Sequence, residues 1–255
     1  MNTQDGKIAL ITGGSRGLGR SMALHLARQG TGVILTYRSN RTEADAVVAE
    51  IAKLGGRAAS LQLDTAIVAG FDEFIARLRE TLTKTWGRDR FNFLVNNAGV
   101  GVHASFAETS EVQFDELMNV HLKGVFFLTQ KLLPLIVDGG RIVNVSSGLA
   151  RFSLPGYAAY ASMKGAIEVL TKYLAKELGA RKITVNVLAP GAIETDFGGG
   201  QVRDNSEVNR FVAANTALGR AGLPDDIGGA IAMLLSPDGG WITGQRIEAS
   251  GGMFL

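Results

Sequence analysis

A tyrosine and a lysine in the segment YAAYASMK (157–164) have the spacing needed to move a proton. Tyr160 and Lys164 are four residues apart, so on a helix their side chains lie on the same face. A free phenol has a pKa of about 10, and a nearby ammonium stabilises the phenolate and lowers that pKa. We therefore predict that Tyr160 is an acid/base group tuned by Lys164. Tyr157 follows LPG, which places it at or before the helix start, as a pocket wall or a packing residue.

Two adjacent serines precede this segment, at the end of an apolar run. Neighbouring side chains of a strand point to opposite faces, so only one of Ser146 and Ser147 can face the same site. One hydroxyl is therefore predicted to serve that site and the other to be structural. The alternation alone leaves open which serine does which.

A glycine-rich turn, TGGSRGLGR, follows the first apolar run and precedes the first helical pattern. Glycine is needed where the backbone turns sharply and its amides approach a ligand without an intervening Cβ. The N-terminus of the next helix favours an anion such as a pyrophosphate. The turn therefore predicts a dinucleotide site formed by Gly13, Ser15, Arg16, Gly17, Leu18 and Gly19.

The second apolar run ends in TYRSN, and its charges indicate which dinucleotide binds. An acidic residue here would grip the ribose diol of NAD, but none occurs from Val33 to Arg41. Arg38 and Ser39, with Arg16 from the glycine-rich turn, offer guanidinium and hydroxyl groups that suit a 2′-phosphate. This pattern favours NADP(H) as the cofactor and leaves NAD(H) as the alternative.

Short apolar runs that alternate with helical patterns position these residues. The predicted strands are 7–12, 33–37, 58–63, 91–96, 141–146, 183–189 and 245–249. The predicted helices are roughly 17–29, 42–54, 70–84, 111–134, 157–178 and 225–235. Nearly continuous apolar strands separated by helices indicate an α/β fold, a doubly wound parallel sheet with helices on both faces. We expect a single domain covering 1–255.

Two segments depart from this pattern. Residues 196–222 begin DFGGG, and a long insertion near the carboxyl ends of the strands is a candidate substrate lid, with a mobile surface loop as the alternative. The helix predicted at 111–134 is apolar around nearly its whole circumference and must be covered on both sides. A homo-oligomer interface or the chain's own loops could cover it, and the sequence does not separate the two.

The composition excludes several other classes of protein. The chain has 255 residues, no cysteine and a net charge of +2. Disulfides, thiol catalysis and cysteine-bound metals are therefore excluded, and no basic run suggests nucleic acid as a partner. No signal pattern and no apolar run of membrane-spanning length occurs, so we expect a cytoplasmic protein. The histidines are far apart, which argues against a metal site and a hydrolase triad: His25, His103 and His121.

Together these motifs resemble the short-chain dehydrogenase/reductase family, including its 3-oxoacyl-thioester reductases. The motifs are Thr12-Gly13-x-x-x-Gly17-x-Gly19, Asn96-Asn97-Ala98-Gly99, Ser147 with Tyr160-x-x-x-Lys164, and Pro190-Gly191. The resemblance extends from Lys7 to Gly252, and its spacing selects Ser147 from the serine pair. It implies a homotetramer or homodimer, with the helices at 111–134 and 157–178 at one interface.

The resemblance also implies roles for individual residues. Ser147 would bind the substrate carbonyl, Tyr160 would be the acid/base, and Lys164 would hold the nicotinamide ribose. Asn119 would maintain a backbone kink and a water in the proton path. The other cofactor contacts would come from Asp64 at the adenine, and from Asn97, Ala98, Gly99, Pro190, Gly191, Ile193 and Thr195.

These features predict an oxidoreductase that transfers a hydride between NADP(H) and a ketone, an aldehyde or a secondary alcohol. An NAD-dependent alcohol dehydrogenase of the same family and a non-catalytic NADP-binding sensor are the alternatives. The predicted pocket walls are mostly apolar or small, which favours an uncharged carbonyl substrate: residues 100–106, 149–157, and Phe197 with the lid. An anionic tail could instead be met by loop arginines, namely Arg151, Arg203 and Arg210.

Overall fold

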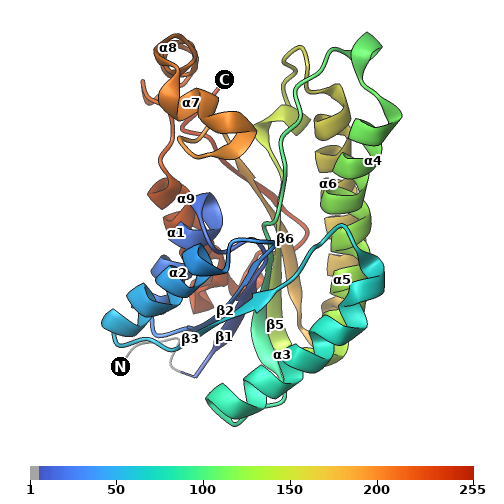
Figure 1. Cartoon of the computed structure of the whole chain (residues 1–255), viewed down its shortest axis with the longest axis vertical. Helices are drawn as coiled ribbons and strands as arrows, with labels where there is room; N and C mark the ends of the chain where they lie inside the picture. Colours follow the sequence, from blue (N-terminus) through green and yellow to red (C-terminus); the bar gives the residue numbers. More distant parts are fainter. Residues whose placement is uncertain (1–5) are drawn as a thin grey trace.

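A seven-stranded parallel sheet, with strands in the order β3-β2-β1-β4-β5-β6-β7, forms the centre of the molecule (Figure 1). The structure is a computed structural model and describes residues 6–255. The strands are β1 (Ile8–Ile11), β2 (Gly32–Tyr37), β3 (Ala58–Gln62), β4 (Phe91–Asn96), β5 (Ile136–Val145), β6 (Thr184–Pro190) and β7 (Arg246–Ala249). This confirms the predicted doubly wound fold.

Helices cover both faces of the sheet, because successive strand residues point to opposite sides (Figure 1). In β1, Ala9 and Ile11 belong to the core under α1 (Gly17–Arg28), α2 (Arg41–Lys53) and α9 (Pro224–Leu235). Ile8 and Leu10 belong to the opposite core, which packs against α3 (Phe71–Trp86), α5 (Gly124–Leu132) and α6 (Ala158–Leu178). Both cores are fully apolar at β1, which explains the uninterrupted hydrophobic run in the sequence.

The strand order reverses between β1 and β4. From β1 the chain continues to β2 and β3 on one side of the sheet, and from β4 it continues to β5, β6 and β7 on the other side. In such sheets the loops after the two strands separate and leave a crevice at the carboxyl ends. The glycine-rich turn follows β1 and the Asn97–Gly99 segment follows β4, so both lie at that crevice.

The helix predicted at 111–134 is interrupted. It consists of α4 (Glu111–Met118), a π-helical turn η3 (Asn119–Lys123), α5 and a 3₁₀ turn. At the end of η3 the backbone approaches the loop after β3 so closely that a Cβ at Gly124 would lie 2.0 Å from the Thr65 carbonyl oxygen. A π-turn adds a residue to a helix and rotates the next helical segment, so η3 determines which side chains face the sheet.

The predicted lid at 196–222 contains more helix than its glycines suggested. It forms a 3₁₀ turn η7 (Phe197–Gly200), α7 (Gln201–Asp204) and α8 (Ser206–Ala214), above the sheet in Figure 1. Gly198, Gly199 and Gly200 have φ of 62°, 76° and 76°, the left-handed region that glycine adopts without strain. Among residues 6–255, no helix is long and apolar enough to cross a membrane.

Candidate active site

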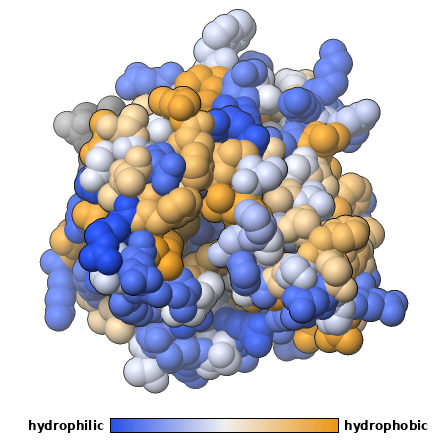
Figure 2. Space-filling model, turned by 90° about the horizontal axis from the view of Figure 1, so that it is seen from above, coloured by the Kyte–Doolittle hydropathy of each residue, from blue (hydrophilic) through white to orange (hydrophobic). Residues whose placement is uncertain are grey.

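A cavity of about 860 Å³ lies at the carboxyl ends of the strands, and Figure 2 shows a hollow there, rimmed partly by apolar side chains. Its volume is at the upper end of the range for ligand pockets. It is lined by every residue predicted to bind the cofactor. Of the four residues predicted to be catalytic, only Asn119 does not line it.

The glycine-rich turn is held against the end of β4. The side-chain amide of Asn97 donates to the carbonyl oxygens of Thr12 (2.9 Å) and Gly13 (3.1 Å). No side chain fits at Gly19, where a Cβ would lie 2.2 Å from the Gly13 carbonyl oxygen. α1 begins at Gly17 with no acidic residue in its first turn, so its free amides and dipole offer an anion site. This cradle fits a pyrophosphate.

The end of the cavity beyond β2 carries unpaired cations. Arg16 and Arg38 both line it, and neither takes part in an ion pair with any residue from 6 to 255. Gln62 Nε2 donates to the Arg38 carbonyl oxygen (3.0 Å) and fixes the turn that carries Ser39. Glu43 adds one negative charge against the two guanidiniums. The donor set fits a ribose 2′-phosphate, which guanidinium and hydroxyl groups bind well.

Tyr160 and Lys164 lie one turn apart on α6 and are both buried, with 7% and 5% of their surface exposed. The Lys164 Nζ donates to the Val145 carbonyl oxygen (2.7 Å) and lies 5.5 Å from the centre of the Tyr160 ring. Tyr157 precedes the helix, with φ and ψ of −119° and 12°, and lines the cavity.

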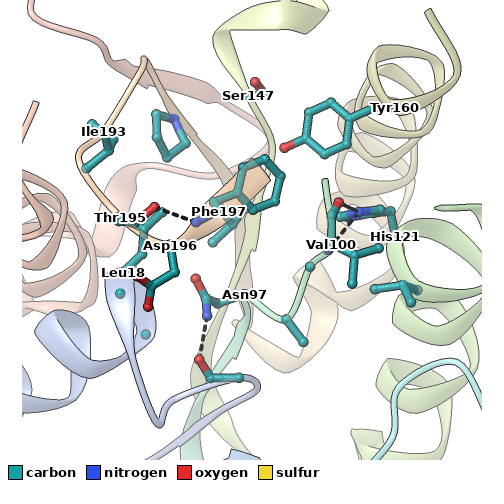
Figure 3. A pocket seen from close by; sticks show the side chains of 18 of the residues that line it. Leu18, Asn97, Val100, His121, Ser147, Tyr160, Ile193, Thr195, Asp196 and Phe197 are labelled. Carbon is teal, nitrogen blue, oxygen red and sulfur yellow. Dashed lines mark hydrogen bonds between the residues drawn. The ribbon is translucent and has the colours of Figure 1, made fainter. Parts of the chain in front are cut away.

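The two serines point in different directions, as their adjacency on a strand predicts. The Ser147 side chain lies beside the Tyr160 hydroxyl (Figure 3). Its Oγ accepts from the Leu149 amide (3.2 Å). Ser146 Oγ donates to a carboxylate oxygen of Glu168 (2.8 Å), on the far side of the strand end. The hydroxyl beside Tyr160 is therefore that of Ser147.

Burial dominates the protonation of this pair. It raises the pKa of Tyr160, an effect that the hydrogen bond from Ser147 reduces and the nearby Tyr157 phenol increases. It lowers the pKa of Lys164 to about 7. The expectation that Lys164 lowers the pKa of Tyr160 is thus not met in the protein alone, because desolvation penalises the charged form of both groups. At neutral pH Tyr160 is a protonated phenol, a state that can donate a proton.

The π-turn carries one residue that was predicted for the site and one that was not. Asn119 begins η3, where the resemblance implied a kink, but it does not line the cavity. His121, two residues further on, does line it, and its ring meets the Tyr160 ring edge-on with 5.1 Å between centroids (Figure 3). The sequence analysis missed His121. The sequence did contain an indication of it: a histidine within a helical segment that is apolar all round is expected to be buried.

Phe197, from the predicted lid, packs against Tyr160. Its ring centroid is 5.7 Å from that of Tyr160, and Figure 3 shows it in the middle of the cavity. Its amide donates to Thr195 Oγ1 (3.2 Å). The ring packs so closely on the loop after β4 that a Cβ at Gly101 would lie 2.9 Å from Phe197 Cε1.

The remaining walls are apolar, as predicted, and come from the predicted segments together with the C-terminal segment. Phe152, Leu154 and Tyr157 line the cavity. Of the loop that follows Ala98, only Gly99 and Val100 line it. Four further apolar side chains line the cavity that were not named individually: Val208, Phe211 and Val212 from the part of the predicted lid that forms α8, and Met253 from the C-terminal segment, which was not predicted. The first three have helical spacing, so an amphipathic helix within the lid was their signal.

Two of the three arginines considered for an anionic substrate are already paired. Arg151 binds Glu248 (2.6 Å), and Arg203 binds Asp204 (2.7 Å). Neither lines the cavity, nor does Arg210. The substrate end is therefore the less polar end of the cavity.

A serine, a histidine and an aspartate meet outside the cavity, where α1 packs on α9. Ser21 Oγ donates to Asp225 (2.7 Å) and lies 3.4 Å from His25 Nδ1. Ser21 is only 2% exposed, and the carboxylate binds the serine instead of orienting the histidine. The cluster lacks the geometry of a hydrolase triad and joins the two helices.

Comparison with known proteins identifies the family. A sequence profile described as enoyl-(acyl carrier protein) reductase matches residues 13–254. The tetrahydroxynaphthalene reductase PfmaG of Pestalotiopsis fici is 37% identical over 258 residues, which cover 97% of this chain and 91% of the relative. The chain belongs to the short-chain dehydrogenase/reductase family and is an oxidoreductase of that family.

Two solved structures are similar over nearly their whole length. The reductase LugOII, which catalyses keto-reduction at C1 during lugdunomycin biosynthesis, is 38% identical with a TM-score of 0.94, covering 99% of this chain and 100% of that one. The landomycin C-6 ketoreductase LanV, solved with NADP and rabelomycin, is 36% identical with a TM-score of 0.90, covering 99% and 98%.

Proposed function

We propose that the protein is an NADP(H)-dependent reductase of bulky, largely apolar ketones, reversible as an alcohol dehydrogenase. The observation that carries this proposal is one cavity with two unlike ends. The Ser147–Tyr160 pair lies among aromatic and aliphatic walls, and the unpaired Arg16 and Arg38 lie at the other end.

The chain's own residues account for the proton chemistry. When bound, NADPH supplies the hydride that reduces the carbonyl carbon. Tyr160, kept protonated by burial, donates its proton to the carbonyl oxygen as negative charge develops there. Ser147 donates a hydrogen bond to the same oxygen and fixes its position. Lys164, anchored on the Val145 carbonyl, would hold the nicotinamide ribose.

The cavity walls support a ring-containing substrate. Phe152, Tyr157 and Phe211 give aromatic surface around Tyr160, and no charged arginine of the lid reaches it. One relative is named a tetrahydroxynaphthalene reductase, and the landomycin C-6 ketoreductase LanV, solved with rabelomycin, has the same fold. We propose that 196–222 acts as the lid, and that Phe197 moves off Tyr160 when a ketone enters.

NADP(H) is proposed over NAD(H) because the end of β2 offers guanidiniums and a hydroxyl in place of a dominant carboxylate. LanV, which is 36% identical, was crystallised with NADP.

We also propose that the protein forms a homotetramer or homodimer through α4, α5 and α6. Phe114 and Phe126 remain 41% and 43% exposed, and Tyr173 on α6 is 65% exposed. Light scattering that gives the mass of a single chain at micromolar concentration would contradict this assembly.

The direct test is NADPH consumption against a panel of carbonyl compounds. The panel runs from acetoacetyl and enoyl thioesters through bicyclic aromatic ketones to sugars, with Tyr160→Phe in parallel. We expect turnover of an aromatic ketone, a loss of about 10³-fold or more in Tyr160→Phe, and unchanged NADPH affinity. Tyr173→Phe, which removes an exposed hydroxyl from the same helix, is the control. Undiminished turnover in Tyr160→Phe would rule out the proposed acid.

A further inference from the structure

A network of four charged side chains lies behind Ser147, and none of its members lines the cavity. It runs from α6 through two residues of β7 to the loop that follows Ser147: Glu168, Arg246, Glu248 and Arg151. The nitrogen-to-oxygen distances along it are 2.8, 2.6 and 2.6 Å. Arg246, in the middle, is only 22% exposed, and the two carboxylates are 18% exposed. The charges alternate in sign, so each buried charge has an opposite neighbour.

Arg246 joins three parts of the fold through three different nitrogen atoms. Its Nε donates to a carboxylate oxygen of Glu168 on α6 (2.8 Å), and its Nη1 donates to Glu248 on β7 (2.6 Å). Its Nη2 donates to the carbonyl oxygen of Ser147, just past the end of β5 (3.2 Å). Because a guanidinium is planar and rigid, the two carboxylates also fix the direction of the third bond.

Ser147 lies where the sheet no longer supports the backbone. The last main-chain bond from this strand end to β6 is the one that the Ser146 amide donates to the Leu188 carbonyl oxygen (2.8 Å). The Ser147 carbonyl oxygen accepts from the Ala150 amide of its own turn (3.2 Å) and from Arg246. Within residues 6–255, the guanidinium is therefore the group that ties the Ser147 backbone to a neighbouring strand.

Glu248 holds Arg246 from the other side and stays ionised. The hydrogen bond from Arg151 is the largest cause that lowers the pKa of Glu248, to about 2; burial opposes it, while Ser250 and Arg246 add to it. Arg151 also donates to the carbonyl oxygen of Met253 (2.6 Å), whose side chain lines the cavity. The network thus connects the position of Ser147 with a wall of the substrate end.

We propose that Arg246 is a positioning residue, which holds the Ser147 carbonyl oxygen and so keeps the Ser147 hydroxyl beside Tyr160 (Figure 3). Glu168 and Glu248 hold the guanidinium in turn. This inference rests on the proposed reductase function, in which the Ser147 hydroxyl binds the carbonyl oxygen of the ketone. A misplacement of about 1 Å can cost about 100-fold in rate, so a side chain outside the cavity can control kcat.

A double-mutant cycle separates positioning from a general structural role. Arg246→Met removes the guanidinium and keeps an unbranched side chain. With NADPH and a ketone that the wild type reduces, we expect kcat to fall about tenfold or more, while the KM for NADPH changes less than about twofold. In Ser147→Ala, which has already lost the hydroxyl, the same substitution should lower kcat further by less than about threefold.

Two further variants control for charge and for the loss of an anchoring arginine. Arg246→Lys keeps the charge between the carboxylates but has one nitrogen where the guanidinium uses three, so its kcat should remain at least about fivefold below that of the wild type. It also replaces Arg246→Met in the cycle should that variant not fold. Arg141→Met removes an arginine of β5 that binds the carbonyl oxygens of Leu234 (3.0 Å) and Pro237 (3.4 Å) away from the cavity. Its kcat should stay within about twofold of wild type.

Three kinetic results would overturn the proposal. The first is a kcat for Arg246→Met within about threefold of wild type. The second is an equal loss in the wild-type and Ser147→Ala backgrounds, which would show that Arg246 does not act through the serine hydroxyl. The third is full recovery of kcat in Arg246→Lys, which would assign the effect to charge instead of to the contact with Ser147.

Hydrogen exchange followed by mass spectrometry tests the inference without turnover. The Leu149 and Ala150 amides donate to the Ser147 side chain and carbonyl, so they report on its position. In the cofactor-free protein, Arg246→Met should speed exchange in residues 147–152 about tenfold and leave the glycine-rich turn at 13–19 unchanged. Unchanged exchange at 147–152, or equally faster exchange along the whole chain, would refute the inference whatever the activity. Failure of the wild type to reduce any ketone would instead count against the proposed function.

Discussion

The two ends of the cavity are built differently. The cofactor end consists of backbone and short turns attached directly to strands, and a single Cβ at Gly19 would collide with the Gly13 carbonyl. The substrate end also contains side chains from the lid, including α8, and from the C-terminal segment, which pack with Phe152 as a small cluster of their own. One end is fixed by the sheet and the other by a separate apolar cluster.

This difference implies that the two ends of the cavity have separate roles in binding. Close backbone contacts leave little freedom at the cofactor end, so its ligand is determined by a few charges such as Arg38. The lid cluster touches the sheet through few residues, so its side chains can vary without disturbing the strands. Substitutions at the two ends should therefore change different kinetic constants.

Arg38→Ala should have the largest effect of the substitutions that test this separation of roles. Loss of an unpaired guanidinium should weaken NADPH binding about 10–100-fold while changing NADH binding little, since only NADPH carries the 2′-phosphate. Fluorescence titration with both dinucleotides measures the two affinities. The control is Arg41→Ala, because Arg41 is paired with Asp45 and does not line the cavity. Equal losses for NADPH and NADH would show that Arg38 does not bind the phosphate.

The same difference explains how well the sequence predicted each end. The glycine-rich turn, Arg38 and the Tyr160–Lys164 pair are local patterns, and each lies where its spacing places it. Met253 reaches the cavity only because the chain end folds back over α8, which no local pattern encodes. His121 lies in a π-turn, at the end of which Gly124 packs closely against Thr65 from a distant part of the chain.

The pKa values of Tyr160 and Lys164 could not be predicted from their spacing in the sequence either. The i,i+4 placement predicted that Lys164 would act on Tyr160, and the two side chains do lie together. The direction of the pKa shift of Tyr160 depends instead on how completely both groups are buried. Burial is a property of the whole fold.

Lys164 lies where the two ends meet, and its burial makes a prediction about stability. Because burial lowers its pKa to about 7, the unfolded chain binds more protons than the folded one between that pH and the ordinary lysine pKa. The free energy of unfolding should therefore rise with pH across this window, and the contribution of Lys164 should stop changing below about pH 7, where the group is protonated in both states. Lys164→Met should remove this contribution, about 1–2 kcal/mol between pH 7 and 9.

Urea denaturation at the two pH values measures the difference. Lys172→Met is the matched control, since Lys172 is an exposed lysine of the same helix and should leave the pH dependence unchanged. Identical pH dependence in wild type and Lys164→Met would show that Lys164 stays charged in the folded protein.

Phe211→Ala tests the substrate end and should have the smallest effect. Phe211 lines the cavity from α8 but is 50% exposed, so its truncation removes only part of a wall. We expect the KM for an aromatic ketone to rise about three- to tenfold, with kcat and NADPH affinity little changed, because the lost contact is made equally before and during reaction. Leu218→Ala provides the control: Leu218 lies in the same segment, 72% exposed and away from the cavity. If Phe211→Ala weakened NADPH binding as much as ketone binding, the lid would be part of the cofactor site, and the two ends of the cavity would not be independent.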